Sequence, residues 1–386
     1  MRSAPDPLLL SLLRGDEPAA VSGDEWRRAA AAARAEGLEA WLYRRIARGA
    51  SDVPDDVRDG LRAASAGVVA RALALAAELA TMLRALAATG VACAPLRGAA
   101  LAELLYGDAC ARPAGDVDLL VRRADLDVVE KTLGALGFRP VDRRAGFARE
   151  FSYTLELARP GVVVEPHWTL AYPPFADALD MDRVWARCRP GRVVGEPALL
   201  LSSESLLLNL CLHLIHKAPD VPLLWLLDVD RLIRREAGAI DWDELLALTR
   251  SAGVERQVGA ALRSVVDLLG TPVASRVLAA LDVTRPAALD RLLVPESLYK
   301  ACLKALGWRR ETGSSHDGAP GLYRGLEEDA VVSLAADPPQ VGSSGRALAD
   351  GLPPALASRV LQCRKDWIER WDRSQHLQDY RDCLAR

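Results

Sequence analysis

The chain has 386 residues, of which 50% are hydrophobic, and its 49 Lys and Arg residues nearly balance 52 Asp and Glu residues, giving a formal net charge of −3. A chain of this composition can bury a large core, so intrinsic disorder is excluded. The near-neutral charge gives no overall electrostatic footprint for nucleic acid, which argues against DNA or RNA as a partner.

Neither the amino terminus nor the cysteines indicate export. Prolines and an acidic residue precede the first leucines, which breaks the order of a signal peptide. The most apolar long stretch, 67–83, contains Arg71 and Glu78, which would be costly in a bilayer core, so we expect a buried or amphipathic helix there. The seven cysteines are scattered and form no CxxC pair, which argues against a disulfide framework. We therefore expect a cytoplasmic protein with no membrane partner.

The first region, up to about residue 90, has the composition of a helical bundle. Residues 24 to about 88 are rich in Ala, Arg, Glu and Leu, with apolar residues at helical spacing. The pattern predicts one helix capped by Asp24 and ending at Gly49, and a second from after Asp55 to before Gly90. Such Ala-rich helices usually serve packing.

Between residues 91 and 170 short apolar runs alternate with short helical stretches. Strands are predicted over 91–96, 116–121, 147–157 and 162–168, and helices over 99–106 and 124–136. This small α/β unit is short for a dinucleotide-binding domain and contains no GxGxxG motif.

Helical patterns return after Ser202, over 204–217, 223–235 and 242 to about 269. The segment 311–354 is rich in Gly, Ser, Pro and Asp, which indicates poor packing. A last helix is predicted over 355–385, with Trp367 and Trp371 at i,i+4 spacing.

The most informative segment combines Arg97-Gly98 with a strand that begins at Asp116 and Asp118. Residues two apart in a strand point to the same face, so the two carboxylates would lie side by side, an arrangement that a cation between them stabilises. Gly98, between a strand and a helix, would let backbone N–H groups approach a triphosphate. Taken alone, a DxD pair at a strand start is more often solvated.

A third carboxylate, Glu165, lies within an apolar strand, where a charged residue needs a partner. A metal site shared with the two aspartates would supply that partner. The plainer alternative is a carboxylate at the end of a strand, exposed by Pro166.

These residues resemble the DNA polymerase beta-like nucleotidyltransferase superfamily, which combines a Gly-containing strand-to-helix turn, a DxD pair and a third carboxylate on a later strand. The resemblance is closer to one bacterial branch, the uncharacterised nucleotidyltransferase family, over about residues 91–232. The matching positions are Arg97-Gly98, Tyr106, Arg112, 116–121, Gly137-Phe138, Glu165-Pro166-His167-Trp168, His213, His216-Lys217 and Trp225 to Asp228.

The resemblance implies an α/β fold: an α+β nucleotidyltransferase-like core with a small mixed sheet at 91–195, flanked by mainly α-helical regions. These would be an N-terminal region at 1–90, a domain closing the cleft at 196–310, and 311–386 with the Gly/Pro/Ser-rich segment and the last helix. The implied catalytic and metal-binding residues are Asp116, Asp118 and Glu165, holding Mg²⁺ or Mn²⁺. The implied nucleotide-binding residues are Arg97, Gly98, Ala99, Arg112, His213, Lys217 and Asp228.

The implied reaction moves a nucleoside monophosphate from an NTP to a hydroxyl or other nucleophile of a small molecule, peptide or protein, with release of pyrophosphate. Three positions depart from the pattern: Ala99 replaces a usual Ser, Glu165 replaces Asp, and His216-Lys217 is inverted. They support an alternative, a nucleotide-binding scaffold of a biosynthetic complex that has lost catalysis. A template-dependent polymerase ranks third because the chain has no basic footprint.

The remaining polar residues of the helices have plainer interpretations. His213 and His216 lie three residues apart on one helical face and would suit a transition metal, but no third ligand stands at an obvious spacing. We therefore favour a core position for His213 and a cleft-lining position for His216. Asp228 would orient His213 or Lys217, whereas Asp230 would form a solvated face with Arg231 and Arg234.

Overall fold

The computed structural model describes residues 5–17, 20–48, 52–141, 148–149, 152–172, 175–217 and 221–281, all within the unit Met1–Ala287. The side chain of Lys217 lies outside this description. The segment 311–354 and the helix predicted over 355–385 also lie outside it.

The amino-terminal residues form helices, as their composition predicts. The helices are α1 (Pro7–Arg14), α2 (Gly23–Ala35), α3 (Glu39–Ala47) and α4 (Asp55–Ala88). The cap of α2 is Ser22 rather than the predicted Asp24, because Ser22 and Glu25 bond each other's backbone N–H in a capping box. The single helix predicted over 24–49 is two helices, since the chain turns at Gly37 with a φ of 69°.

The central sheet has five strands in the order β1-β2-β5-β4-β3. The strands are β1 (Cys93–Pro95), β2 (Val117–Val121), β3 (Arg139–Pro140), β4 (Leu157–Arg159) and β5 (Val162–His167). Strands β2 and β5 run parallel and the other neighbours run antiparallel, which confirms the predicted small mixed sheet with helical flanks. The strand predicted over 147–157 is wrong: residues 148–149 are helical, and β4 begins only at Leu157.

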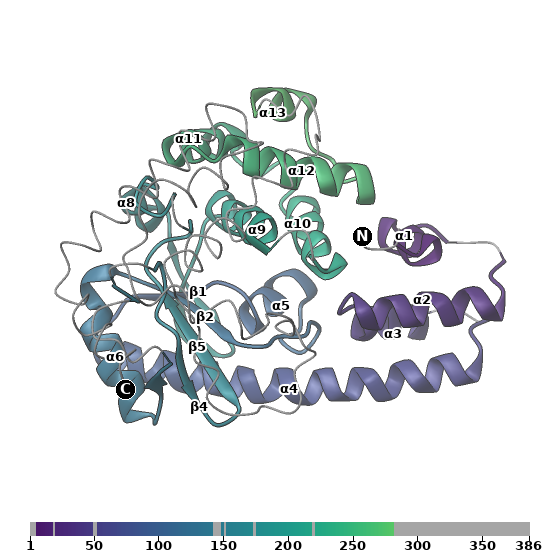
Figure 1. Cartoon of the computed structure of the whole chain (residues 1–386), viewed down its shortest axis with the longest axis horizontal. Helices are drawn as coiled ribbons and strands as arrows, with labels where there is room; N and C mark the ends of the chain where they lie inside the picture. Colours follow the sequence, from purple (N-terminus) through teal and green to yellow (C-terminus); the bar gives the residue numbers. More distant parts are fainter. Residues whose placement is uncertain are drawn as a thin grey trace, which may run out of the picture. The chain divides into compact units, whose positions relative to one another are not determined.

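Alternate residues of the sheet face two different hydrophobic cores. Val117, Leu119 and Val121 of β2 pack into one core with α4 and α6 (Leu126–Ala135), whereas Leu120 packs into the other, with the helices α9 to α12. Figure 1 shows α4 beneath the sheet and α9 above it. Because side chains alternate along a strand, Asp118 shares the face of Leu120 and points toward the α9 side.

After the sheet the chain forms a short helix and a two-stranded hairpin, and then the second helical region, which packs around α9. The elements in order are α8 (Met181–Ala186), β6 (Arg189–Val193), β7 (Glu196–Leu200), α9 (Ser203–Lys217), α10 (Leu223–Arg235), α11 (Trp242–Ala252), α12 (Glu255–Leu269) and α13 (Ser275–Ala280). Helix α9 contacts α10, α11 and α12. The helix predicted over 242–269 is broken at Gly253, which caps α11 with a φ of 66°.

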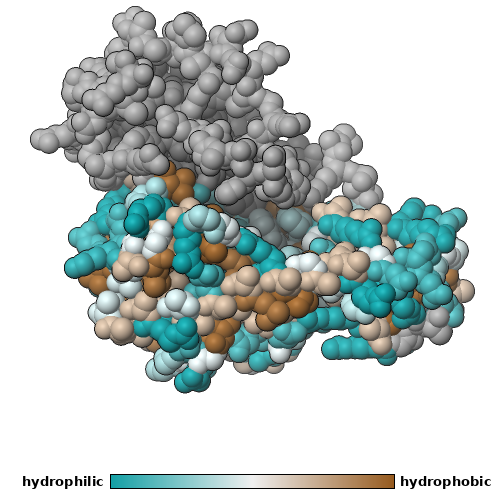
Figure 2. Space-filling view, turned by 90° about the horizontal axis from the view of Figure 1, so that it is seen from below, coloured by the Kyte–Doolittle hydropathy of each residue, from teal (hydrophilic) through white to brown (hydrophobic). Residues whose placement is uncertain are grey.

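Helix α4 extends beneath the sheet and beneath α2 and α3 (Figure 1). Among the described residues it is the one helix long and apolar enough, by length and composition, to cross a membrane. The two charged residues of its apolar stretch 67–83 contact the sheet region: Arg71 donates to the carbonyls of Gly115 and Gly161, and Glu78 pairs with Arg159. Apolar patches interrupt the polar surface on the face of the molecule seen from below (Figure 2), and Leu73 of α4 is 56% exposed.

Candidate functional site

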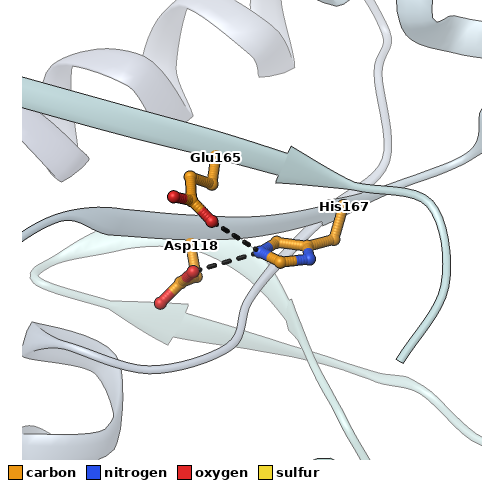
Figure 3. A group of neighbouring side chains, drawn as sticks. All are labelled: Asp118, Glu165 and His167. Atoms are coloured by element: carbon orange, nitrogen blue, oxygen red, sulfur yellow. Dashed lines mark hydrogen bonds and ion pairs between the residues drawn. The ribbon is translucent and has the colours of Figure 1, made fainter. Parts of the chain in front are cut away.

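The parallel pairing of β2 with β5 brings two of the predicted carboxylates together. The register places Asp118 opposite Glu165, and His167 follows two residues later on the same face of β5. One ligand atom from each of these three side chains lies within 4.8 Å of the others (Figure 3). The His167 Nε2 atom is 3.1 Å from Asp118 Oδ1 and 3.7 Å from Glu165 Oε2.

Asp116 lies beside this group rather than within it. The chain bends at Asp116, and β2 begins one residue later than predicted, so the two aspartates are not side by side in one strand. Asp116 nevertheless lies near enough for its charge to raise the pKa of Glu165. The structure therefore groups Asp118 and Glu165 with His167, to which the sequence assigned no role.

Arg97 forms a two-point ion pair with Asp118. Its Nε donates to Oδ2 at 2.9 Å and its Nη2 to Oδ1 at 2.6 Å, while Nη1 donates to Asn209 Oδ1 at 3.3 Å. The two side chains are only 10% and 4% exposed. Burial alone would raise the pKa of Asp118, but the charge of Arg97 and the hydrogen bond from His167 outweigh it and hold the pKa far below its usual range.

Glu165 has the opposite electrostatic character. Burial, followed by the negative charges of Asp118 and Asp116, raises its pKa from 4.5 to about 8. Its side chain is still 26% exposed. Near neutral pH this carboxyl therefore holds a proton, which an added positive charge would displace.

The turn that precedes α5 (Ala99–Tyr106) has a backbone conformation that favours glycine. Gly98 has a φ of 61° and a ψ of −130°, a combination that residues other than glycine rarely adopt. A Cβ at Gly98 would lie 3.5 Å from the Asp116 carbonyl oxygen. The first N–H groups of α5 have no partner inside the helix, and Ala99 adds no hydroxyl to them. Backbone donors and Arg97 are thus what this turn offers a phosphate.

Helix α9 adds a polar face to the site. Asn209, His213 and His216 stand about one turn apart along it. Asn209 accepts from Arg97, and the charge of His213, whose ring is 4.2 Å from that of Trp225, helps lower the pKa of Asp118. His216 is buried and stacks on Tyr172, with ring centroids 4.4 Å apart. Sequence reasoning missed Asn209, although its spacing of four residues before His213 was a usable signal.

Two of the residues predicted to bind nucleotide form a separate buried network. Arg112 Nε donates to Asp228 Oδ2 at 2.9 Å, and the Tyr106 hydroxyl donates to Asp228 Oδ1 at 2.8 Å. Asp228 therefore anchors Arg112 and Tyr106, and its role of orienting His213 or Lys217 stays a prediction. Both Arg112 and Asp228 are buried, and burial raises the pKa of Asp228.

The prediction for Asp230 is wrong, because this residue does not lie on a solvated face. Its side chain is 1% exposed and accepts hydrogen bonds from Arg234 Nε and the Thr271 hydroxyl, each at 2.7 Å. The predicted proximity to Arg234 holds, but the pair closes a buried contact between α10 and the chain after α12.

A small mixed sheet that joins carboxylates to a glycine turn at a helix N-terminus is suited to bind a cation together with a phosphate. Residues 22–270 match the family described as uncharacterised nucleotidyltransferase, and the chain belongs to this family. The family resemblance read from the motifs is thereby confirmed. Among curated proteins and among solved structures, none matches the chain.

Proposed function

We propose that the protein is a metal-dependent nucleotidyltransferase that moves a nucleoside monophosphate from an NTP to an acceptor nucleophile and releases pyrophosphate. The observation that carries this proposal is the pairing of Asp118 with Glu165 across parallel strands, beside Gly98 and the start of α5. Family membership supports an NTP as the substrate. The wider superfamily and the cytoplasmic location stay predictions.

The side chains of the site fit a divalent cation. Two carboxylates and an imidazole nitrogen lie close enough to bind one metal ion. The Arg97 guanidinium already places a positive charge beside Asp118. The pKa of Glu165 is raised first by burial and then by the negative charges of Asp118 and Asp116, which outweigh the opposing charge of Arg97. Asp118 and Glu165 would hold the ion, with Asp116 close by. Once bound, such an ion neutralises phosphate charge and aligns the attacking and leaving oxygens.

Arg97 would be shared between Asp118 and the nucleotide. It directly precedes Gly98, so its guanidinium lies next to the N-terminus of α5, where phosphates would bind. A triphosphate offers the same two-point geometry that Asp118 offers now. When Arg97 binds the triphosphate, its two hydrogen bonds to Asp118 are released. Nucleotide and cation would then enter the site together.

The acceptor would approach from the side of α9, where Asn209 and His213 border the carboxylates. Its class, whether small molecule, peptide or protein, is left open by these residues. Nucleic acid is the least favoured acceptor because the chain carries no excess of positive charge.

The proposal is tested by pyrophosphate release from a mixture of the four NTPs with Mg²⁺ or Mn²⁺, using an extract of the native host as the source of acceptor. We expect release that requires metal and is lost in Asp118→Asn. Release that is equally fast in Asp118→Asn would contradict the proposal.

A second candidate is the catalytically impaired nucleotide-binding scaffold of a biosynthetic complex. The observation that favours it is the pair between Arg97 and Asp118, which leaves no oxygen of Asp118 without a donor. This alternative predicts NTP binding without pyrophosphate release under every metal and acceptor condition tested.

A further inference from the structure

We infer that His167 is a nitrogen ligand of the cation site, and that the site therefore takes a divalent transition-metal ion, Mn²⁺ before Mg²⁺. The inference rests on the site of the proposed function and deepens it. The observation behind it is the position of His167 Nε2, which lies between Asp118 and Glu165 and faces both (Figure 3).

The position of His167 is fixed by the fold. It lies on β5 two residues after Glu165, so strand alternation turns both side chains to the same face. Its side chain is only 4% exposed, and its backbone forms a bridge with Thr154. The ring of Tyr153 packs 5.4 Å from the imidazole. A ring held in this way presents Nε2 to the carboxylates without the entropy cost of ordering a mobile side chain. When the ion replaces the hydrogen bond to Asp118, Nε2 binds through its lone pair and the neutral imidazole carries its proton on Nδ1.

The donor set decides which ion fits. Mg²⁺ prefers oxygen ligands and retains its waters, whereas an imidazole nitrogen favours transition metals. Mn²⁺ binds carboxylate and phosphate oxygens as Mg²⁺ does, and as a first-row transition metal it binds an imidazole nitrogen more readily than Mg²⁺ does. Two carboxylates with one histidine thus give Mn²⁺ every ligand that Mg²⁺ would have, and one more that Mg²⁺ uses poorly.

His213 is the competing source of nitrogen. Its charge reaches Asp118, but it stands on α9 with its ring against Trp225 and lies outside the group of three. It is therefore the matched control for any test that detects a bound nitrogen.

The test uses the full chain with Mn²⁺ and a nonhydrolysable NTP analogue, which provides an alternative partner for Arg97. Electron spin-echo modulation of Mn²⁺ detects directly bound nitrogen. We expect ¹⁴N modulation in the wild type that changes to ¹⁵N when histidine alone is labelled, persists in His213→Gln and is lost in His167→Asn. The Mn²⁺ affinity of His167→Asn should fall by at least about tenfold, and its Mg²⁺ affinity by less.

Thermal unfolding of His167→Asn shows whether the variant folds. If it does not, the histidine-labelled wild type and His213→Gln decide the question. Bound Mn²⁺ without histidine modulation would overturn the inference and leave the proposed function standing. Modulation from His167 in a protein that releases no pyrophosphate would support the inference and contradict the proposed function. No Mn²⁺ binding, or preference for Mg²⁺ in direct competition, would also overturn the inference.

Discussion

Two buried arginine–aspartate pairs flank α5, and only one of them belongs to the candidate site. Arg97 lies before the helix and pairs with Asp118 at two points, whereas Arg112 lies after the helix and donates to Asp228 through Nε; both pairs are similarly buried. Asp228 has the Tyr106 hydroxyl as its other partner, so this pair is balanced in charge and satisfied in hydrogen bonds. Asp118 instead has Glu165 beside it.

The comparison teaches that a buried ion pair does not mark a site by itself. What distinguishes the pair at Asp118 is a second carboxyl beside it: burial, and then the charges of Asp118 and Asp116, raise the pKa of Glu165. Ionising this carboxyl is costly unless a ligand of opposite charge balances it. We therefore propose that the Arg112–Asp228 pair is structural and that the Arg97–Asp118 pair is prepared for a cation.

The largest expected effect is on turnover. Asp118→Asn should lower metal-dependent pyrophosphate release by more than about a hundredfold, because loss of a direct ligand exceeds the typical loss for an outer-shell residue. The matched control is Asp127→Asn on α6, whose side chain is 84% exposed. Similar rates for the two variants would remove Asp118 from the reaction.

The two pairs should differ most clearly in stability. Asp228→Asn leaves Arg112 buried without a counter-charge, so we expect a loss of about 3–5 kcal/mol in the free energy of unfolding, measured by denaturant titration. Asp118→Asn should cost less, because Glu165 can ionise and take over part of the charge balance at Arg97. An equal or larger loss in Asp118→Asn would contradict the distinction between the pairs.

Removing the arginine should free the cation site. Arg97→Met is expected to raise the affinity for Mn²⁺ in the absence of nucleotide by about tenfold or more, since a positive charge within contact of Asp118 is lost. Calorimetric titration measures the affinity, and Arg189→Met, at an exposed position on β6, is the control. An unchanged affinity would show that Arg97 does not compete with the cation.

The smallest effect is a pH dependence of stability. Folding raises the Glu165 pKa from 4.5 to about 8, so between these values the folded protein keeps a proton that the unfolded chain releases. Stability in metal-free buffer should therefore fall as pH rises through this window. Glu165→Gln should remove that part of the slope and Glu17→Gln, at an 86% exposed side chain, should not. The same dependence of melting temperature on pH in all three proteins would contradict the raised pKa of Glu165.

The parts of the site that local patterns encode could be predicted from the sequence. The strands of Asp118 and Glu165 and the turn at Gly98 follow from apolar runs and a glycine before a helix, and the structure has them where expected. Helix α10 was also predicted with its observed bounds, because its apolar spacing is regular.

The parts that depend on tertiary contacts could not be predicted. Arg97 contacts Asp118, which lies 21 residues away in the sequence, and Asn209, which lies 112 residues away, and no sequence spacing predicts either contact. The burial of Asp230 depends on Thr271, a residue 41 positions away. Strand alternation alone places His167 on the face of Glu165, but only the register of β5 against β2 shows that Asp118 lies beside them.

The central claim, a cation site built on Asp118 and Glu165, is tested most directly by counting protons. Titration of Mn²⁺ into the full chain at pH 7, with the NTP analogue present and in buffers of different ionisation enthalpy, measures the protons released on binding. Because the pKa of Glu165 is about 8, we predict release of about one proton per ion by the wild type and fewer by Glu165→Gln. Binding without proton release by the wild type, or no binding, would contradict the account.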